Sequence, residues 1–176
     1  LINCVGGGSS AYGFWSEFID FPKKQVELIG VEAGGPAQSK LHAAPLSKGA
    51  KLGILHGAAS YVCQNKDGQI NETESISAGL DYPGVSPIHC FLKDTKRAKY
   101  TYATDEEALK AFKLVTKFEK LNPSLEPSHA FAEAIAYAPK LSKNTIIIVN
   151  SCGDAKKDRD ILKKRLRKLK WIVLSI

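Results

Sequence analysis

The residues from Gly6 to Ser10, "GGGSS", follow the apolar run Leu1–Val5 and have the types needed to hold an anion. Glycines leave backbone N–H groups uncovered, and a helix that begins directly after them adds the positive end of its dipole. The two serine hydroxyls add further donors. The spacing of a dinucleotide or nucleoside triphosphate loop is missing, so a single phosphate is the expected ligand. The alternative is a plain tight turn between a strand and a helix.

A second stretch, "SISAGLDYPGVSP", places Asp81 among small and turn-forming residues. A carboxylate there could accept a hydrogen bond from a substrate hydroxyl or ammonium group. It could equally form a turn with its own backbone ahead of Pro83. The residues by themselves leave both interpretations open.

Two further stretches place polar side chains next to predicted elements. Glu126 and His129 lie at or just before a predicted helix start, where Glu126 could serve the helix dipole and His129 could be a hydrogen-bonded structural residue. Ser151 and Cys152 emerge from an apolar strand, so a hydroxyl there could point into the same crevice as the glycine loop. A nucleophilic Cys152 finds no specific histidine partner in the sequence.

Predicted strands and helices alternate along the chain. Strands are predicted at Leu1–Val5, Val26–Glu32, Lys99–Ala103 and Thr145–Val149, and helices at Ala11–Phe21, 104–120, Ser128–Ala138 and 158–169. A capping box, Thr104 with Glu107, opens the second helix. This alternation predicts an α/β three-layer sandwich with a mostly parallel sheet, whose ligands lie at the carboxyl ends of the strands. The glycine- and serine-rich region between Gly34 and Pro87 is expected to be an elaborated functional region.

Composition restricts the class of protein. The chain has 176 residues, a length that predicts one domain, and its net charge is +7. No apolar run is long enough for a membrane helix. The four cysteines form no CxxC pair, which argues against a zinc site and fits reduced thiols in a cytoplasmic protein. The basic segment near the end is interpreted as an amphipathic helix, with Ile161, Leu162, Leu166 and Leu169 inward.

Six stretches together resemble the C-terminal half of the tryptophan synthase beta chain family. In order they are "CVGGGSSA", "LIGVEAGG", "DGQINETESISAGLDYPGVSP", "YATDEEALKAF", "PSLEPSHAFAEAI" and "IIIVNSCGD". The resemblance covers nearly all of the range from Ile2 to Asp158, and "SISAGLDYPGV" and "ATDEEAL" are its most specific parts. It implies that residues 1–170 form a single α/β domain equivalent to that half, and that residues 171–176, "WIVLSI", are a variable tail.

The resemblance implies part of a fold-type II enzyme that depends on pyridoxal 5′-phosphate (PLP). It implies that the cofactor phosphate is held by Gly6, Gly7, Gly8, Ser9 and Ser10, where Ser10 replaces the family's usual asparagine. Glu126 would lie beside the cofactor ring, Ser151 would bond the pyridine nitrogen, and Asp81 would handle the hydroxyl of the serine substrate. A monovalent cation, Na⁺ or K⁺, would bind backbone carbonyls near Gly6, Tyr82 and Gly84.

The resemblance also implies a reaction and partners. L-serine and indole would give L-tryptophan and water, in a beta–beta homodimer that binds the tryptophan synthase alpha chain. Neither a nucleic acid nor a membrane is expected as a partner.

Two departures from the family limit these expectations. The family's Schiff-base lysine belongs to its N-terminal half and is absent from these residues, so we expect a fragment with at most weak cofactor binding and no turnover. Where the family commonly has "SGRGDKD", this chain has "NSCGDAKKDRD", which leaves Cys152 one position away from the expected ring-nitrogen partner.

Two alternatives remain open at the level of sequence. One is a related PLP enzyme of the same fold, a serine or threonine dehydratase or a cysteine synthase. The other is a non-catalytic phosphate- or nucleic-acid-binding module that uses Gly6–Ser10 and the basic segment, whose binding to DNA would depend steeply on salt.

Overall fold

The computed structural model describes residues 1–168, with no description of the side chains at positions 167 and 168. The predicted tail, residues 171–176, the predicted domain end at 170 and the inward position of Leu169 lie outside the described residues.

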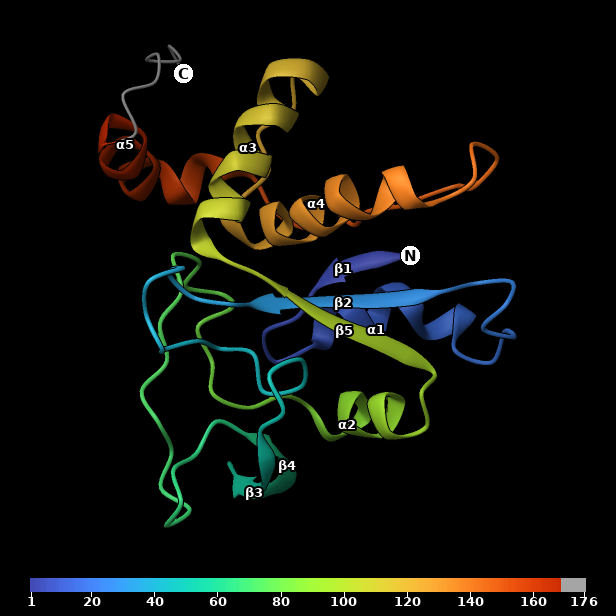
Figure 1. Ribbon diagram of the computed structural model, residues 1–176, viewed down its shortest axis with the longest axis vertical. Helices are drawn as coiled ribbons and strands as arrows, with labels where there is room; N and C mark the ends of the chain where they lie inside the picture. The colour runs from blue at the N-terminus through green and yellow to red at the C-terminus, as the bar shows by residue number, and fades with distance from the viewer. Residues whose placement is uncertain (169–176) are drawn as a thin grey trace.

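A parallel sheet of three strands forms the centre of the chain (Figure 1). Its strands are β1 (Ile2–Cys4), β2 (Leu28–Ala33) and β5 (Ala98–Ala103), in the order β1-β2-β5. β2 is buried along its whole length because it pairs with a parallel strand on each side and is covered on both faces.

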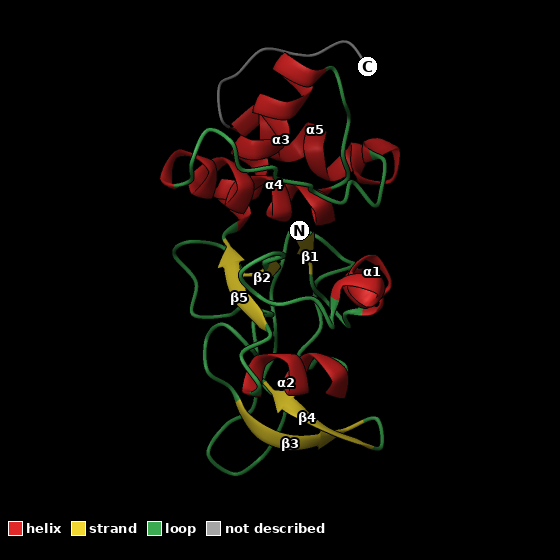
Figure 2. Cartoon of the chain, turned by 90° about the vertical axis from the view of Figure 1, so that its right-hand side faces the viewer, coloured by secondary structure: helices red, strands yellow, loops and turns green. Residues whose placement is uncertain are grey.

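Helices cover both faces of this sheet, which confirms the predicted three-layer α/β architecture (Figures 1 and 2). On one face, α1 (Ser9–Trp15) and α2 (Pro87–Asp94) pack on a core that includes Trp15, Leu28 and Leu92. On the other face, α4 (Leu125–Tyr137) packs on Ile2 and Ile29. A 3-10 turn, Ser16–Phe18, follows α1, so the regular helix ends earlier than predicted.

Two more helices pack beyond the layer that α4 forms. α3 (Asp105–Glu119) begins with the predicted capping box, in which the Thr104 side chain accepts from the Glu107 N–H and the Glu107 carboxylate accepts from the Thr104 N–H. α5 (Arg159–Lys168) follows a 3-10 turn, Ala155–Asp158. Leu162 of α5 is buried and Leu166 is partly buried, as predicted, but Ile161 is 38% exposed and not inward.

The prediction of a buried strand at Thr145–Val149 was wrong. This segment makes only one isolated parallel bridge, between Val149 and Ile2, at the open edge of the sheet. Ile147 and Val149 pack against the core, whereas Ile146 is 85% exposed and Ile148 is 50% exposed. The apolar run is therefore covered on one face only, which an uninterrupted isoleucine run cannot reveal.

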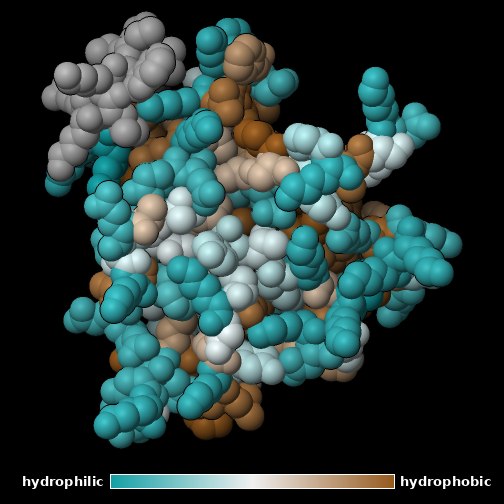
Figure 3. Space-filling view, in the orientation of Figure 1, coloured by the Kyte–Doolittle hydropathy of each residue, from teal (hydrophilic) through white to brown (hydrophobic). Residues whose placement is uncertain are grey.

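The region between Gly34 and Pro87 contains an antiparallel hairpin that sequence patterns missed. Its strands are β3 (Lys51–Leu55) and β4 (Ala58–Val62), and it projects away from the parallel sheet beyond α2 (Figure 2). Hydrophobic colour gathers at the foot of the molecule, over this hairpin (Figure 3), and Leu52 and Ile54 of β3 are exposed. No helix among residues 1–168 has the length and apolar character required to cross a membrane.

Candidate functional site

The four stretches singled out in the sequence meet at the carboxyl end of β1. Gly6 lies against the backbone of Gly79 and Leu80, and Gly7 accepts a hydrogen bond from the Ser86 N–H, which joins the first stretch to the second. The Gly79 N–H donates to Glu126 Oε1 at 3.1 Å, which joins the second to the third. The fold therefore brings together stretches that are separated by up to 145 positions, of which only residues 6–10 and 150–152 follow a predicted strand.

The glycine loop presents a row of free backbone donors. Among residues 1–168, none of the N–H groups from Gly6 to Ser10 donates a hydrogen bond to a protein group. The loop leads into α1 through Gly8, whose φ of 102° is one that side-chain-bearing residues rarely adopt. Free N–H groups at the start of a helix attract a negative group. Gly7, Ser9 and Ser10 are exposed, so this part of the row is open to solvent, whereas Gly6 is half-buried and Gly8 is buried.

A buried histidine, which the sequence analysis did not single out, contacts the glycine loop on its inner side. His89 of α2 lies with Nε2 at 2.8 Å from the Gly8 carbonyl and Nδ1 at 2.8 Å from the Tyr100 hydroxyl. Burial lowers the pKa of His89 and so favours the neutral ring. A neutral ring has one donor, which it can give to Gly8 while accepting from Tyr100. The loop's shape is thus fixed by an uncharged contact.

Ser10 joins three segments at the loop's outer edge. Its hydroxyl oxygen accepts from Asn3 Nδ2 at 3.2 Å and from Asn150 Nδ2 at 3.4 Å. Because both partners are donors, the Ser10 hydroxyl proton remains available for another acceptor. Asn3 is fully buried and its Oδ1 has no partner among the described residues.

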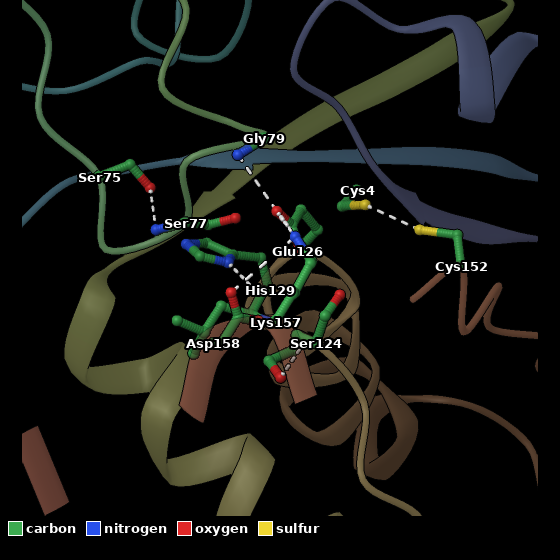
Figure 4. A network of polar contacts seen from close by, with 12 residues as sticks. Cys4, Ser75, Ser77, Gly79, Ser124, Glu126, His129, Cys152, Lys157 and Asp158 are labelled. Carbon is green, nitrogen blue, oxygen red and sulfur yellow. Dashed lines mark hydrogen bonds and ion pairs between the residues drawn. The ribbon is translucent and has the colours of Figure 1, made fainter. Parts of the chain in front are cut away.

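Successive side chains of the turn after Val149 point in different directions. Asn150 reaches Ser10, and Cys152 lies with its sulfur 3.6 Å from that of Cys4 (Figure 4). Ser151, between them, is exposed and makes no side-chain hydrogen bond within the described part of the chain. The side chains that approach the loop are therefore Asn150 and Cys152, and the role of Ser151 as a ring-nitrogen partner stays a prediction.

Glu126 is buried and paired with a lysine. Its Oε1 accepts from Lys157 Nζ as well as from the Gly79 N–H (Figure 4). Burial alone would raise the pKa of Glu126, but the hydrogen-bonded ion pair with Lys157 outweighs it and lowers the pKa to about 2. Glu126 is therefore ionised at neutral pH, and its buried Oε2 has no partner among residues 1–168.

His129 is placed as a structural residue. Its Nδ1 lies 2.7 Å from the Leu125 carbonyl one turn earlier in α4, and burial lowers its pKa. The Nε2 atom is buried and has no partner in the described part of the chain, and the same holds for the Ser77 hydroxyl. Glu126 and His129 are both buried, and His129 is a hydrogen-bonded residue, which is one of the two roles that the sequence left open.

Asp81 is exposed, and its carboxylate makes no hydrogen bond to any described residue. The Asp81 N–H donates to the Ser77 carbonyl at 3.1 Å, so the residue belongs to a turn that the Gly79–Glu126 hydrogen bond fastens to α4. The predicted turn between the Asp81 side chain and its own backbone is therefore wrong, because only the Asp81 N–H takes part in the turn, and the substrate role of the carboxylate stays a prediction. No cluster of three or more His, Cys, Asp or Glu side chains among residues 1–168 could hold a metal ion.

These features define an α/β chain whose parallel sheet ends at a glycine loop with free N–H groups, bordered by a buried glutamate that pairs with a half-exposed lysine. In sequence, 159 residues are 51% identical to the tryptophan synthase beta chain of Chromobacterium violaceum, over 90% of this chain and 39% of that protein. The chain is 46% identical over 171 residues to the tryptophan synthase beta chain of Bradyrhizobium sp. (strain ORS 278), which covers 95% of this chain and 41% of that protein. It is 53% identical over 159 residues to tryptophan synthase beta chain 1 of Chlamydia caviae, which covers 90% of this chain and 38% of that protein.

The chain is thus related to tryptophan synthase beta chains over nearly all of its length, which confirms the resemblance seen in its motifs. It spans about two-fifths of the length of these relatives, in their C-terminal part. No protein-family model matches the chain.

Proposed function

We propose that this chain forms the phosphate-holding wall of a PLP site in a tryptophan synthase, which joins L-serine and indole to give L-tryptophan and water. The observation that carries the proposal is the row of free N–H groups from Gly6 to Ser10 at the start of α1. Sequence identity of 46–53% to three proteins with that name supports the choice of reaction.

The residues present fit the cofactor's phosphate. Gly6 and Gly8 have no room for a side chain, because a Cβ atom would collide with Gly79 or His89, whereas Gly7 faces open space. The backbone is thus held tightly on its inner side and left bare on its outer side. PLP supplies an electron sink for chemistry at the amino-acid substrate when it is bound. The N–H groups, with the hydroxyls of Ser9 and Ser10, would hold its phosphate.

Other side chains would position the remaining groups. Glu126, kept ionised by Lys157, presents a fixed negative charge on the inner side of the site. The free carboxylate of Asp81 could accept a hydrogen bond from the hydroxyl of L-serine. A monovalent cation at the carbonyls of Gly6, Tyr82 and Gly84, an alpha-chain partner and a beta–beta homodimer belong to the same proposal, and they rest on the family resemblance.

The phosphate assignment is tested by isothermal titration of the chain with pyridoxamine 5′-phosphate and with pyridoxamine. These probes lack the aldehyde, so they do not react with surface lysines. We expect the phosphorylated compound to bind at least about tenfold more tightly, since charge-assisted hydrogen bonds contribute about 1.5–3 kcal/mol each.

A variant with an added negative charge tests whether the phosphate binds at the glycine loop, residues 6–10. Ser9→Asp places a carboxylate at the start of α1, where it favours the helix dipole and should not unfold the protein. It should nevertheless remove the preference for the phosphorylated probe by repulsion. Ser142→Asp is the matched control, because Ser142 is exposed and its side-chain oxygen accepts from the Asn144 N–H, a role that aspartate can keep. Equal affinity of the two probes, or equal behaviour of the two variants, would contradict the phosphate assignment.

The reaction itself is tested on the gene product that carries this chain. Tryptophan formation from L-serine that requires indole supports a tryptophan synthase. Release of pyruvate from L-serine at the same rate with and without indole would favour the dehydratase alternative.

A further inference from the structure

Two cysteines at opposite ends of the sequence lie together at the edge of the candidate site. The Sγ atoms of Cys4 and Cys152 are 3.6 Å apart, although 148 positions separate them (Figure 4). Both thiols are free, as are those of Cys63 and Cys90. Cys4 is the last residue of β1 and is buried, whereas Cys152 is exposed.

The backbone holds these two residues on adjacent extended segments. The Ile2 N–H donates to the Ile148 carbonyl at 2.9 Å, and the Asn150 N–H donates to the Ile2 carbonyl at 3.1 Å. The second of these hydrogen bonds lies two residues before each cysteine, so the pairing anchors both segments next to the Cys4–Cys152 contact. A bond requires the two sulfurs to approach by about 1.5 Å more, to the usual separation of about 2.05 Å. Rotation about the side-chain bonds of the exposed Cys152 can supply much of this movement.

The environments of the two sulfurs make them chemically different. The hydrogen bond from Cys4, with a further one from Ser10, outweighs the effect of burial and lowers the pKa of Cys152 to about 6. The same contact with Cys152, together with burial, raises the pKa of Cys4 well above its ordinary value. At neutral pH the exposed sulfur is therefore the thiolate and the buried sulfur keeps its proton. This is the division of roles between an attacking and a resolving thiol.

We propose that Cys152 and Cys4 are a hydroperoxide-sensitive thiol pair, which closes to a disulfide beside the glycine loop. In the first step the Cys152 thiolate attacks a peroxide oxygen. A sulfur–oxygen bond forms, the O–O bond breaks, and the leaving alkoxide or hydroxide takes a proton from water. Cys152 becomes a sulfenic acid and the hydroperoxide is reduced to an alcohol or to water.

In the second step Cys4 attacks the Cys152 sulfur. The sulfur–sulfur bond forms, the S–OH bond breaks, and the departing hydroxide leaves as water with the Cys4 proton. Conversion of Cys152 to the neutral sulfenic acid removes the negative charge that opposed ionisation of Cys4, so the first step prepares the second. A small-molecule thiol restores both cysteines by exchange. Neither step involves the cofactor, and the proposal rests on the Cys4–Cys152 contact, although the single Ser10 hydroxyl proton goes either to Cys152 or to a bound phosphate.

The test treats the full chain with one equivalent of hydrogen peroxide at pH 7, blocks the remaining thiols, and maps tryptic peptides without reduction. We expect the peptide that contains Cys4 to be joined to Asn144–Lys156, which contains Cys152, with the loss of two hydrogen atoms, and dithiothreitol to separate them. Oxidation of Cys152 beyond the sulfenic acid without this crosslink, or a crosslink that involves Cys63 or Cys90 instead, would overturn the proposal.

The rate of alkylation provides a measurement that needs no oxidant. Thiols with pKa values of about 6 for Cys152 and about 11 for Cys63 are about 90% and about 0.01% ionised at pH 7. Iodoacetamide should therefore modify Cys152 at least about 100-fold faster than Cys63, with a half-maximal rate near pH 6. Similar rates for these two cysteines would contradict the assignment of Cys152 as the reactive thiol.

Variants separate the two roles. Cys152→Ser should abolish peroxide consumption and the crosslink, whereas Cys63→Ser and Cys90→Ser, the controls, should leave both unchanged. Cys4→Ser keeps a hydrogen-bond donor beside Cys152 but cannot form the disulfide, so dimedone should trap the Cys152 sulfenic acid, which the wild-type chain resolves. If Cys4→Ser does not fold, the peptide map and the alkylation rates of the wild-type chain still decide the question.

Discussion

Replacement of Gly8 by alanine is expected to lower the free energy of unfolding by about 2–4 kcal/mol, the range for backbone strain combined with overpacking. Gly8 has a φ of 102°, and a Cβ atom there would collide with the ring of His89. That ring cannot move aside cheaply, because it is buried and hydrogen-bonded to both Gly8 and Tyr100. Urea denaturation of the variant and the wild-type chain gives the difference directly.

Gly7→Ala is the matched control for this experiment. Gly7 lies next to Gly8 in the same loop, but nothing stands within 4 Å of the position its Cβ would take, and its φ lies outside the left-handed region. We expect a change of less than about 0.5 kcal/mol, which is typical of a surface position without strain. A loss of stability in Gly7→Ala equal to that in Gly8→Ala would show that the loop is sensitive to any side chain and that His89 does not shape it.

His89 also shows where sequence reasoning about the site ended. The three glycines and the serines after them indicated a bare backbone, and that part of the site was predictable from local sequence. His89, whose ring leaves no room for a side chain at Gly8, lies 81 positions away. It belongs to α2, a helix that the sequence analysis did not predict. Local spacing carries no information on such a contact, because it depends on how α1 and α2 pack on the same face of the sheet.

The fold was predictable where sequence patterns report covered faces, and less so where they do not. The capping box at Thr104 and the buried β2 have local signatures, and both were found. The run Thr145–Val149 has the composition of a central strand, yet it lies at the edge of the sheet. A signal for the missed hairpin was present at His56–Gly57, which both have positive φ, as a two-residue hairpin turn requires, although histidine is an uncommon first residue there.

The charged part of the site was predictable in kind but not in detail. Glu126 was singled out from its place near a helix start, but the lysine that pairs with it was not. Lys156 and Lys157 are adjacent and identical in type, and only the 3-10 turn at Ala155–Asp158 decides which of them points towards Glu126. That choice is worth testing because it controls the charge of a buried carboxylate.

Lys157→Met is expected to lower the free energy of unfolding at pH 7 by about 1–3 kcal/mol. The variant leaves the Glu126 carboxylate buried without its cation, and removal of one partner from a buried pair is more costly than removal of both. The expected loss lies below the range for fully buried pairs because the Lys157 side chain is 52% exposed, so solvent screens part of the interaction. Lys156→Met is the matched control, since the Lys156 side chain is exposed and makes no ion pair among residues 1–168.

The pH dependence of this loss identifies Glu126 as its source. In the wild-type chain the pKa of Glu126 falls from 4.5 to about 2 on folding, so its contribution to stability is complete above about pH 4.5 and disappears as the pH falls towards 2. In Lys157→Met the effect of burial remains while that of the cation is lost, so the pKa of Glu126 is higher than in the wild-type chain and its contribution to stability at neutral pH is smaller. Urea unfolding of both proteins between pH 2 and 7 should therefore show the largest difference at neutral pH and a shrinking one below about pH 4.5.

A double variant separates this explanation from a loss of packing by the lysine stem. Glu126→Gln removes the buried charge, so adding Lys157→Met to it should cost less than Lys157→Met costs in the wild-type background. Equal costs in the two backgrounds would show that Lys157 stabilises the turn through its apolar stem. The ion pair would then make no measurable contribution to the free energy that holds the 3-10 turn Ala155–Asp158 against α4. A reduced cost would show that the buried charge of Glu126, and with it the inner side of the candidate site, depends on a residue to which the sequence analysis assigned no role.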